Sequence, residues 1–262
     1  MRPLHCALVA PDLVKVDGDG AVRTLTLDSP HNRNALSSGL LDELTDGLRN
    51  ATSDDAVRVI VLTGTGTVFC SGADLSESGE FRTARMEALL SMIDSAPVPV
   101  IARVNGHARA GGLGLIAASD LAVAPRASTF AFSEVRVGVA PALILVPALP
   151  VVERRFLART MLTGESFSAD EAASAGLLTD VVDDEEGLNG WVQRVVDSVL
   201  KSAPGAVSAT KSLLHSLPEM PFAEGLATAG RRSAELFAGA EAAEGMDAFL
   251  QKRRPSWDRV DP

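Results

Sequence analysis

The sequence is poor in aromatic residues and carries a surplus of acidic ones. Tyrosine is absent, tryptophan occurs twice, and aromatic residues make up 4% of the 262 positions. A surface that stacks nucleic-acid bases, or an aromatic cage, needs more rings than this. Lysine and arginine number 24 against 34 aspartates and glutamates, which gives a formal net charge of −10. Since a nucleic-acid binder carries a basic surface, we expect no nucleic-acid partner.

Cysteines, histidine clusters and long apolar runs are scarce as well. The two cysteines, Cys6 and Cys70, are too few for a disulfide framework or a metal cluster, which favours a reducing compartment. The four histidines are scattered without the spacing of a metal site: His5, His31, His107 and His215. The apolar run near the N-terminus is broken by Pro11 and Asp12, and no stretch is long enough to cross a bilayer. We therefore expect a cytoplasmic protein that binds neither a metal nor a membrane.

What the sequence does contain is a large apolar fraction arranged as alternating strands and helices. Hydrophobic residues make up 46% of the chain, enough for a sizeable core. The alternating segment 22–27 predicts a strand, and the apolar runs 57–63, 98–104 and 121–124 predict strands covered on both faces. Helical patterns lie between them, from about Ser37, over 82–94 and over 113–118. This alternation predicts an α/β fold with much parallel pairing.

The last part of the chain has a different pattern. Strand signals end near residue 185, and helices are predicted over 188–202, 206–217, 222–237 and 241–254. No fixed-period repeat and no low-complexity linker interrupts the chain. We expect an α/β core over residues 1–190, which carries the functional site, and a helical C-terminal region over residues 191–262.

Three glycine-containing stretches, 63–75, 105–114 and 130–141, follow predicted strands. Small residues let a ligand approach the main chain, and two converging N–H groups can hold a carbonyl oxygen as it becomes an enolate. Glu134 is the only acid in the apolar part of the third stretch, between Phe132 and Val135. Partial burial would raise its pKa and make it a usable acid–base group. The alternative is that the glycines form ordinary turns and that Glu134 lies on the surface at a strand end.

Competing motifs are weaker. Gly112, Gly114 and Ala117 match a dinucleotide fingerprint, but they do not directly follow their strand, and the acid that should hold a ribose lies beyond the next strand. No P-loop and no Gly-x-Ser-x-Gly nucleophile motif occurs. His107 could reach a site beside the second stretch, although a histidine that caps a turn is commoner. Cys70 is expected to be a small buried residue rather than a nucleophile.

Six blocks, taken in order, resemble the crotonase (enoyl-CoA hydratase/isomerase) family. They are Asn-Ala-Leu at 34–36, Phe-Cys-Ser-Gly-Ala-Asp-Leu at 69–75, Val-Asn-Gly-His-Ala at 104–108 with the glycines at 111–112, Asp-Leu-Ala-Val-Ala at 120–124, the segment 162–172 with Gly-Leu at 176–177, and the segment 244–253. Each block alone is weak, but six in register are specific, and together they span nearly the whole chain.

The resemblance implies a spiral of ββα units with a helical trimerisation region, a homotrimer or hexamer, and an acyl-CoA thioester substrate. It places the oxyanion hole at the backbone N–H groups of Ala73 and Gly111, with Glu134 as the acid–base group. No cofactor is implied beyond the coenzyme A of the substrate. Phe249 and Lys252 would come from the C-terminal helix of a neighbouring subunit. The other residues expected to contact substrate or CoA are Arg33 (near the phosphates), Ala35, Ser71, Ala73, Asp74, Leu75, Arg109 and Gly112.

The sequence also departs from the family pattern. Hydratases of this family typically carry two glutamates; the second matches Glu134, but Gly114 stands where the first is usual. Ala110 replaces the first glycine of the family's Gly-Gly-Gly. One carboxylate can still move a proton of an enolisable thioester, which would give isomerisation, or activate water and then reprotonate the α-carbon. Hydration, isomerisation, a branched or carboxylated substrate such as 3-methylglutaconyl-CoA, and a non-catalytic acyl-CoA binder therefore stay open; decarboxylation and thioester hydrolysis are less favoured.

Two further points concern charged residues near the glycine stretches. A charged Arg109 inside the second stretch must reach solvent or find an anion, so it could pair with a distal carboxylate of the substrate. The Arg136 side chain would lie on the same face of the chain as that of Glu134 only if the segment that contains both residues is extended. Glu77 or Glu80 could replace the missing acid if the variable segment after the first stretch brought either one into the site.

Overall fold

The computed structural model describes residues 12–18, 20–77 and 79–258, and its centre is a six-stranded, mostly parallel sheet. In this main sheet the described strands lie in the order β1-β2-β3-β5-β7-β10. Their bounds are β1 Val14–Asp17, β2 Val22–Leu27, β3 Val59–Gly64, β5 Val100–Arg103, β7 Leu121–Pro125 and β10 Asp180–Val182. All neighbours pair in parallel except β1, which runs antiparallel to β2. The predicted α/β class and its four predicted strands are confirmed, with β2 at the predicted bounds.

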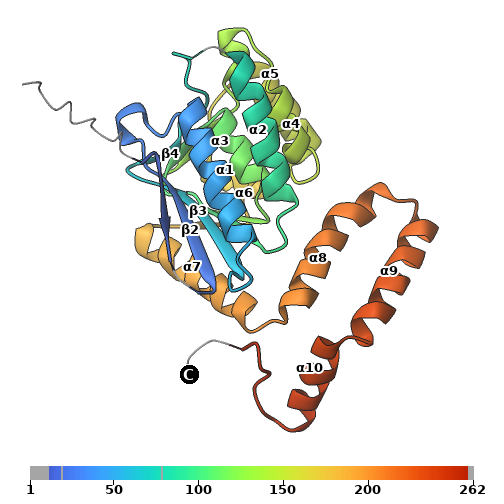
Figure 1. The fold of residues 1–262 in the computed structure, drawn as a ribbon. Coiled ribbons are helices and arrows are strands. Elements are labelled where there is room, and N and C mark those ends of the chain that lie inside the picture. The colour runs from blue at the N-terminus through green and yellow to red at the C-terminus, as the bar shows by residue number, and fades with distance from the viewer. Residues whose placement is uncertain (1–11, 19, 78, 259–262) are drawn as a thin grey trace, which may run out of the picture.

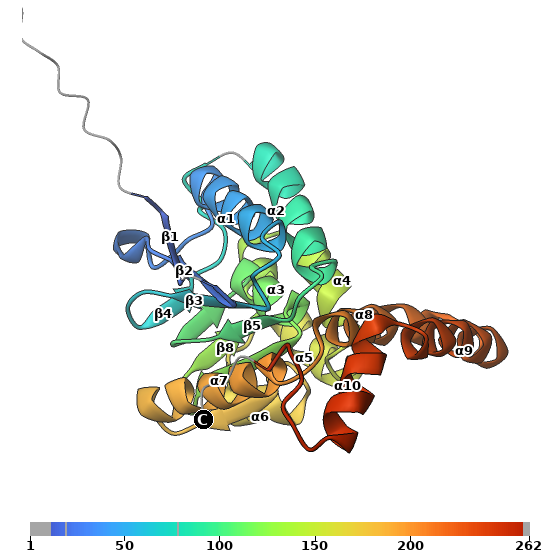
Figure 2. The same cartoon turned by 60° about the horizontal axis from the view of Figure 1, so that its bottom comes forward.

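Both faces of the main sheet are covered, as the apolar runs predict. Leu25, Ile60 and Leu62 face a core formed with three helices on one side of the sheet, α1 Ser38–Thr52, α2 Gly79–Asp94 and α3 Gly111–Ala118 (Figures 1 and 2). Val61 and Ile101 face the opposite side, where α7 Glu185–Leu200 covers the sheet. Alternate residues of one strand therefore enter different cores.

Helix α1 shows why the sequence forms a helix at this place. The Ser37 hydroxyl accepts a hydrogen bond from the Leu40 N–H at 3.2 Å, which satisfies one of the unpaired N–H groups of the first turn. Leu40, Leu44 and Leu48 recur at helical spacing and are buried. The helix predicted from about Ser37 is confirmed.

A second, smaller sheet was not predicted. Its described strands lie in the order β4-β6-β8-β9, with bounds β4 Val68–Cys70, β6 His107–Arg109, β8 Thr129–Ala131 and β9 Phe167–Ser168. Strands β4, β6 and β8 run parallel, and β9 closes the sheet antiparallel to β8. Strands of two or three residues are too short to show a period, so they depend on their neighbours rather than on a pattern of their own.

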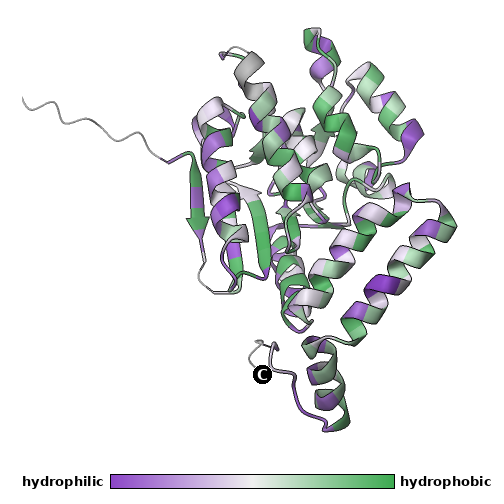
Figure 3. Ribbon diagram, turned by 45° about the vertical axis from the view of Figure 1, so that its right-hand side comes forward, coloured by the Kyte–Doolittle hydropathy of each residue, from purple (hydrophilic) through white to green (hydrophobic). Residues whose placement is uncertain are grey.

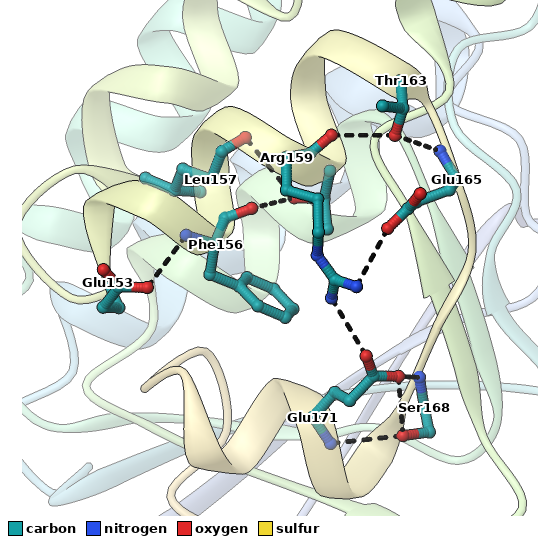
Figure 4. A network of polar contacts seen from close by, with 9 residues as sticks. Glu153, Phe156, Leu157, Arg159, Thr163, Glu165, Ser168 and Glu171 are labelled. Carbon is teal, nitrogen blue, oxygen red and sulfur yellow. Dashed lines mark hydrogen bonds and ion pairs between the residues drawn. The ribbon is translucent and has the colours of Figure 1, made fainter.

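The chain also forms several short helices: η1 Pro30–Asn32, η2 Glu134–Val137, α4 Ala142–Ala148, α5 Arg154–Thr163 and α6 Ala169–Ser174. Of these, α6 packs against β8 and β9 of the small sheet, and α4 packs against α3. Figure 4 shows how α5 and α6 are joined: the Arg159 guanidinium bridges Glu165 at 3.1 Å and Glu171 at 3.0 Å, while Glu171 and Ser168 form a reciprocal cap at the start of α6. Helix α5 in turn packs against η2.

The C-terminal region leaves the body as an arm. Helices α8 Pro204–Ser216 and α9 Phe222–Phe237, joined by η3 Leu217–Glu219, form a hairpin that is followed by α10 Ala240–Leu250 (Figures 1 and 2). Helix α9 buries no residue, and its Phe222, Leu226 and Phe237 are largely exposed, as are apolar residues of α10. Figure 3 shows hydrophobic and hydrophilic residues interspersed along the helices of this arm. The predicted boundary at residues 190–191 falls inside α7, which packs on the main sheet. None of the helices in the described ranges has the length and apolar character needed to span a membrane.

A buried lysine attaches this arm to the body. The Lys211 ammonium of α8 donates to Asp120 Oδ2 at 2.7 Å and to the carbonyl oxygens of Ile93 and Val98 at 3.2 and 3.3 Å. Its side chain is only 7% exposed, and the same Asp120 oxygen accepts the N–H of Val100 at 2.7 Å. The lysine thus has partners at the end of α2, before β5 and before β7.

Replacing Lys211 by alanine is expected to lower the free energy of unfolding by about 3–5 kcal/mol, because the largely buried Asp120 carboxylate would lose the ammonium group that neutralises it. Urea denaturation at one fixed protein concentration measures the effect. Lys201→Ala, at the exposed end of α7, is the matched control and should change stability by less than about 0.5 kcal/mol. Equal stability of the two variants would contradict the role of Lys211 as an anchor.

Candidate active site

Three parallel strands of the small sheet bring the three glycine-containing stretches to one edge. Strand β4 pairs with β6 and β6 with β8, so their carboxyl ends lie side by side. The N–H of Ala110, just after β6, donates to the carbonyl oxygen of Ala131 at the end of β8 at 3.0 Å. Ala73, Gly111 and Glu134 therefore follow neighbouring strand ends.

Two buried or half-buried asparagine side chains hold the turn between β3 and β4. The Asn34 carboxamide, 0% exposed, accepts the N–H of Ser29 at 2.9 Å and donates to the carbonyl oxygen of Val68 at 2.8 Å. The Asn105 carboxamide accepts the N–H of Gly64 at 3.0 Å and donates to the Gly66 carbonyl oxygen at 2.8 Å. These contacts fix the backbone that leads into the first glycine stretch.

The N–H of Ala73 is oriented by Leu36. The Leu36 N–H donates to the Gly72 carbonyl oxygen at 2.8 Å, and the Asp74 N–H donates to the Leu36 carbonyl oxygen at 3.2 Å, so Leu36 and Ala73 form an isolated parallel bridge. In such a bridge the N–H of the central residue points to the opposite side. Ala73 is exposed, and its N–H has no acceptor within the described ranges.

The N–H of Gly111 opens helix α3, where the first turn has no acceptor inside the helix. A Cβ atom on Gly111 would lie 2.7 Å from Leu36 Cδ1, and one on Gly112 would lie 2.8 Å from Cys70 Cβ. Glycine is therefore required at both positions. Ala110, just before them, has φ 47° and ψ −120°, a conformation that glycine adopts far more easily than alanine.

Glu134 is the first residue of η2 rather than the end of a strand. Both oxygens of its carboxyl group are buried and have no hydrogen-bond partner in the part of the chain that the structure describes. Burial is the main influence on this carboxyl group and raises its pKa above the ordinary value. The carboxyl group is thus an unpaired acid, turned away from bulk solvent, at the edge where Ala73 and Gly111 lie.

Apolar atoms fill the space beside Gly114, where a second glutamate is usual. A Cβ atom on Gly114 would meet Met86 Cε at 3.3 Å and Ile144 Cγ1 at 3.3 Å. Met86 and Ile144 are 8% and 6% exposed. A longer side chain at position 114 would therefore collide with both.

Glu77 does not replace the missing glutamate. Its carboxylate accepts the N–H and the hydroxyl of Ser38 at 2.9 and 2.7 Å. The side chain of Glu80 lies outside the described residues.

The remaining residues expected around the first stretch lie together. Arg33 is exposed and Ala35 is buried, next to Asn34. The Ser71 hydroxyl donates to the Asn32 carbonyl oxygen at 3.1 Å, and Asp74 accepts hydrogen bonds from Ser76. The Leu75 side chain is 73% exposed.

Arg109 is the last residue of β6 rather than part of the loop. Its guanidinium donates to Thr129 Oγ1 at 2.9 Å, to the Thr129 carbonyl oxygen and to its neighbour's carbonyl oxygen at 2.8 Å. Burial lowers the pKa of Arg109. The His107 ring nitrogen Nδ1 accepts the N–H of Thr129 at 3.1 Å. His107 therefore holds a backbone group, which fits the expectation of a histidine that caps a turn. Arg136 is not in an extended segment; it donates to the Thr163 carbonyl oxygen at 3.3 Å and covers Gly164.

Three other predicted residues lie either in the core or in the C-terminal arm. Cys70 is 0% exposed, and burial raises the pKa of its thiol to about 12, so the prediction of a small buried residue is confirmed. Phe249 and Lys252 are exposed and lie at or just after the end of α10. Helix α10 lies away from α1, α3 and β4 of the same chain (Figures 1 and 2). Within one chain these two residues therefore do not lie beside Ala73 and Gly111.

Sequence reasoning missed Leu36, Met86 and Ile144 as residues of this site. Leu36 belongs to the Asn-Ala-Leu block, which could have drawn attention to it. Met86 and Ile144 had no sequence signal, because both belong to ordinary apolar helix patterns. In the described ranges no group of histidine, cysteine, aspartate and glutamate residues could hold a metal ion.

Main-chain donors and an unpaired carboxyl group that follow neighbouring strand ends are the parts of a site that can stabilise an enolate oxygen while a proton moves. Residues 17–260 match the family model described as enoyl-CoA hydratase/isomerase. A mitochondrial "enoyl-CoA hydratase domain-containing protein 3" of Danio rerio is 32% identical over 257 residues, covering 95% of this chain and 89% of that protein. The 2,3-dehydroadipyl-CoA hydratase of Escherichia coli is 32% identical over 242 residues, covering 90% and 94%.

The fold is also similar to that of a solved structure with a related name. The enoyl-CoA hydratase of Mycobacterium smegmatis has a TM-score of 0.88 and 35% identity, covering 94% of this chain and 98% of the other. The chain belongs to the enoyl-CoA hydratase/isomerase family and is an enzyme of that family. The crotonase-like fold that its sequence blocks imply is confirmed.

Replacing Ala110 by glycine should raise the free energy of unfolding by about 1 kcal/mol. The strain of the alanine conformation, about 1–3 kcal/mol, exceeds the extra entropy that a glycine loses on folding, about 0.5–1 kcal/mol. Ala108→Gly, two residues earlier on β6, is the matched control: its backbone is unstrained and its buried methyl group would be lost, so stability should fall. Urea denaturation compares the two, and a loss of stability in both would contradict the strain at Ala110.

Proposed function

We propose that this protein adds water to an enoyl-CoA thioester, with Glu134 as its single acid–base group. The observation that carries the proposal is the buried, unpaired carboxyl group of Glu134 at the strand ends that also present the N–H groups of Ala73 and Gly111. A carboxyl group without a partner is costly in a folded protein, and such groups concentrate at sites of proton transfer.

The proposed steps balance as follows. The ionised Glu134 takes a proton from water while the water oxygen bonds to the β-carbon of the enoyl group. The electron pair of the double bond moves to the thioester oxygen, which becomes an enolate held by the N–H groups of Ala73 and Gly111. The neutral Glu134 then returns the proton to the α-carbon as the carbonyl re-forms. No cofactor is needed beyond the coenzyme A of the substrate.

A second candidate, double-bond isomerisation, is favoured by the surroundings of Gly114. Met86 and Ile144 fill the space where a second carboxylate would help to place water. One acid suffices to remove a proton from one carbon of a thioester and to return it to another. The same assays separate this reaction from hydration.

Arg109 supports a substrate with a distal carboxylate. Its half-buried guanidinium contacts only neutral oxygens in the described chain, and an anion would be a stronger partner. The name of the related Escherichia coli protein points to a substrate of this kind. The 3-methylglutaconyl-CoA-like substrate expected from the sequence belongs to the same class.

The exposed apolar residues of the arm favour a homotrimer or hexamer. An uncovered face that includes Phe222, Leu226 and Phe237 fits an interface between copies of the chain. We propose that a neighbouring subunit supplies Phe249 and Lys252 to the CoA site, near Arg33. Because some relatives are mitochondrial, the cytoplasmic location expected from the sequence stays a prediction.

Glu134→Gln should lower kcat for crotonyl-CoA by about 10²- to 10⁴-fold, since the amide cannot exchange the proton. Loss of absorbance of the conjugated thioester measures hydration, and gain of absorbance with a 3-enoyl-CoA measures isomerisation. Glu186→Gln, exposed on α7, is the control and should leave kcat unchanged. A Glu134→Gln variant with full activity would refute the assignment. Faster conversion of the 3-enoyl-CoA would select the second candidate, and acyl-CoA binding without turnover would indicate a non-catalytic binder.

The same substitution should change how stability depends on pH. Burial raises the pKa of Glu134 in the folded state, so the folded protein holds this proton more tightly than the unfolded chain does. The contribution of Glu134 to stability is therefore present at low pH and is lost as pH rises from the ordinary carboxyl range through the raised pKa. The stability of Glu134→Gln relative to the native protein should increase over that range, as measured by urea denaturation. A difference that falls with rising pH would contradict the raised pKa.

Mixed oligomers test whether Lys252 acts on a neighbouring subunit. Lys252→Glu should raise KM for the CoA substrate, and Glu134→Gln should abolish turnover. In oligomers co-assembled from equal amounts of both variants, about a quarter of the sites would combine an intact Glu134 with an intact Lys252 of the neighbour, and low-KM activity should return. If Lys252 served its own chain, no site would have both residues, and no low-KM activity would return.

A further inference from the structure

Leu36 contacts both segments that carry the proposed oxyanion donors. Through its main chain it forms the bridge to Ala73, with hydrogen bonds of 2.8 Å to the Gly72 carbonyl oxygen and 3.2 Å from the Asp74 N–H. Through its side chain it covers Gly111, because Leu36 Cδ1 occupies the space of the missing Gly111 side chain, 2.7 Å from where a Cβ atom would be. One residue thus contacts the donor segment of each loop.

The position of Leu36 is itself tightly fixed. Two residues before it, the buried Asn34 carboxamide is held by the backbone on either side of the β3–β4 turn. Directly after it, Ser37 caps helix α1, and the Glu77 carboxylate holds the N–H of Ser38. Leu36 is 3% exposed, so its side chain has little freedom to move.

The second side chain near Gly111 can move more easily than that of Leu36. The nearest other side chain is that of Met86, whose Cε lies 3.9 Å from the position of a Gly111 Cβ. Methionine is flexible and adapts to changes in the space around it. Leu36 is therefore the stiffer of the two contacts that limit how far the Gly111 segment can move relative to Ala73.

We propose that Leu36 is a positioning residue that sets the spacing between the N–H groups of Ala73 and Gly111. This inference rests on the proposed function, in which the two groups hold one oxygen. Preorganised donors lose much of their effect when they are displaced by about 1 Å, so shortening the Leu36 side chain should weaken the stabilisation of the enolate more than it weakens substrate binding.

The test compares Leu36→Ala with Leu48→Ala, a buried leucine near the other end of α1 that serves as a control for lost packing. Both variants should lose stability to urea. Leu36→Ala should lower kcat by about 10- to 100-fold and change KM by less than about 3-fold, whereas Leu48→Ala should change neither by more than about 3-fold. Leu36→Met, which conserves the volume, should restore most of kcat. If Leu36→Ala does not fold, Leu36→Val, which lacks the δ-carbons, takes its place.

A spectroscopic measurement reports the donors directly. The absorption band of a bound aryl-conjugated enoyl-CoA moves to longer wavelength when hydrogen bonds polarise its thioester carbonyl. The movement should be smaller in Leu36→Ala than in the native protein and unchanged in Leu48→Ala. Equal movement in the two variants, or equal loss of kcat, would overturn the role of Leu36 alone. A native protein that binds the probe without moving its band would overturn the oxyanion assignment of the proposed function as well.

Discussion

The carboxamide of Asn34 is the contact on which the site depends most. It is buried, and its oxygen and nitrogen are both satisfied by backbone groups on two separate segments. A buried amide with satisfied partners specifies one arrangement, since any other leaves polar groups unpaired. Through this contact the turn before α1 is held against the turn after β3. Leu36 and, through it, Ala73 then take defined positions at the edge of the small sheet.

Most of the buried polar side chains around the site hold segments of the fold together, whereas one of them is proposed to transfer a proton. Asn34 and Lys211 are buried and Asn105 is half-buried, and each has several partners, so they hold segments together. Glu134 is also buried but has no partner among the described residues. Its unpaired state is unfavourable for stability and useful for proton transfer, because a carboxyl group with a raised pKa holds a proton more readily and can both take and return one.

The surroundings of this acid differ from the two-glutamate arrangement that the family pattern describes. At position 114 the chain has a glycine, and Met86 and Ile144 close the space beside it. At position 110 it has an alanine in a backbone conformation suited to glycine. Both departures from the family pattern lie at the N-terminal end of helix α3, at its N-cap Ala110 and in its first turn at Gly114. Together they leave the main-chain donors in place while they remove one acid, so the reaction depends on a single carboxyl group.

The parallel core, the helical C-terminal region and the glycine stretches with Glu134 can be predicted from the amino-acid pattern, because long apolar runs and helical periodicity are local properties. The small sheet cannot be predicted in this way, because its strands are too short to show a period and form only when distant segments pair. The tertiary structure also decided that Leu36, Met86 and Ile144 enter the site, and that Arg109 is held by Thr129. These contacts form between side chains of segments that are far apart in the chain. The spacing of residues along the sequence therefore does not predict them.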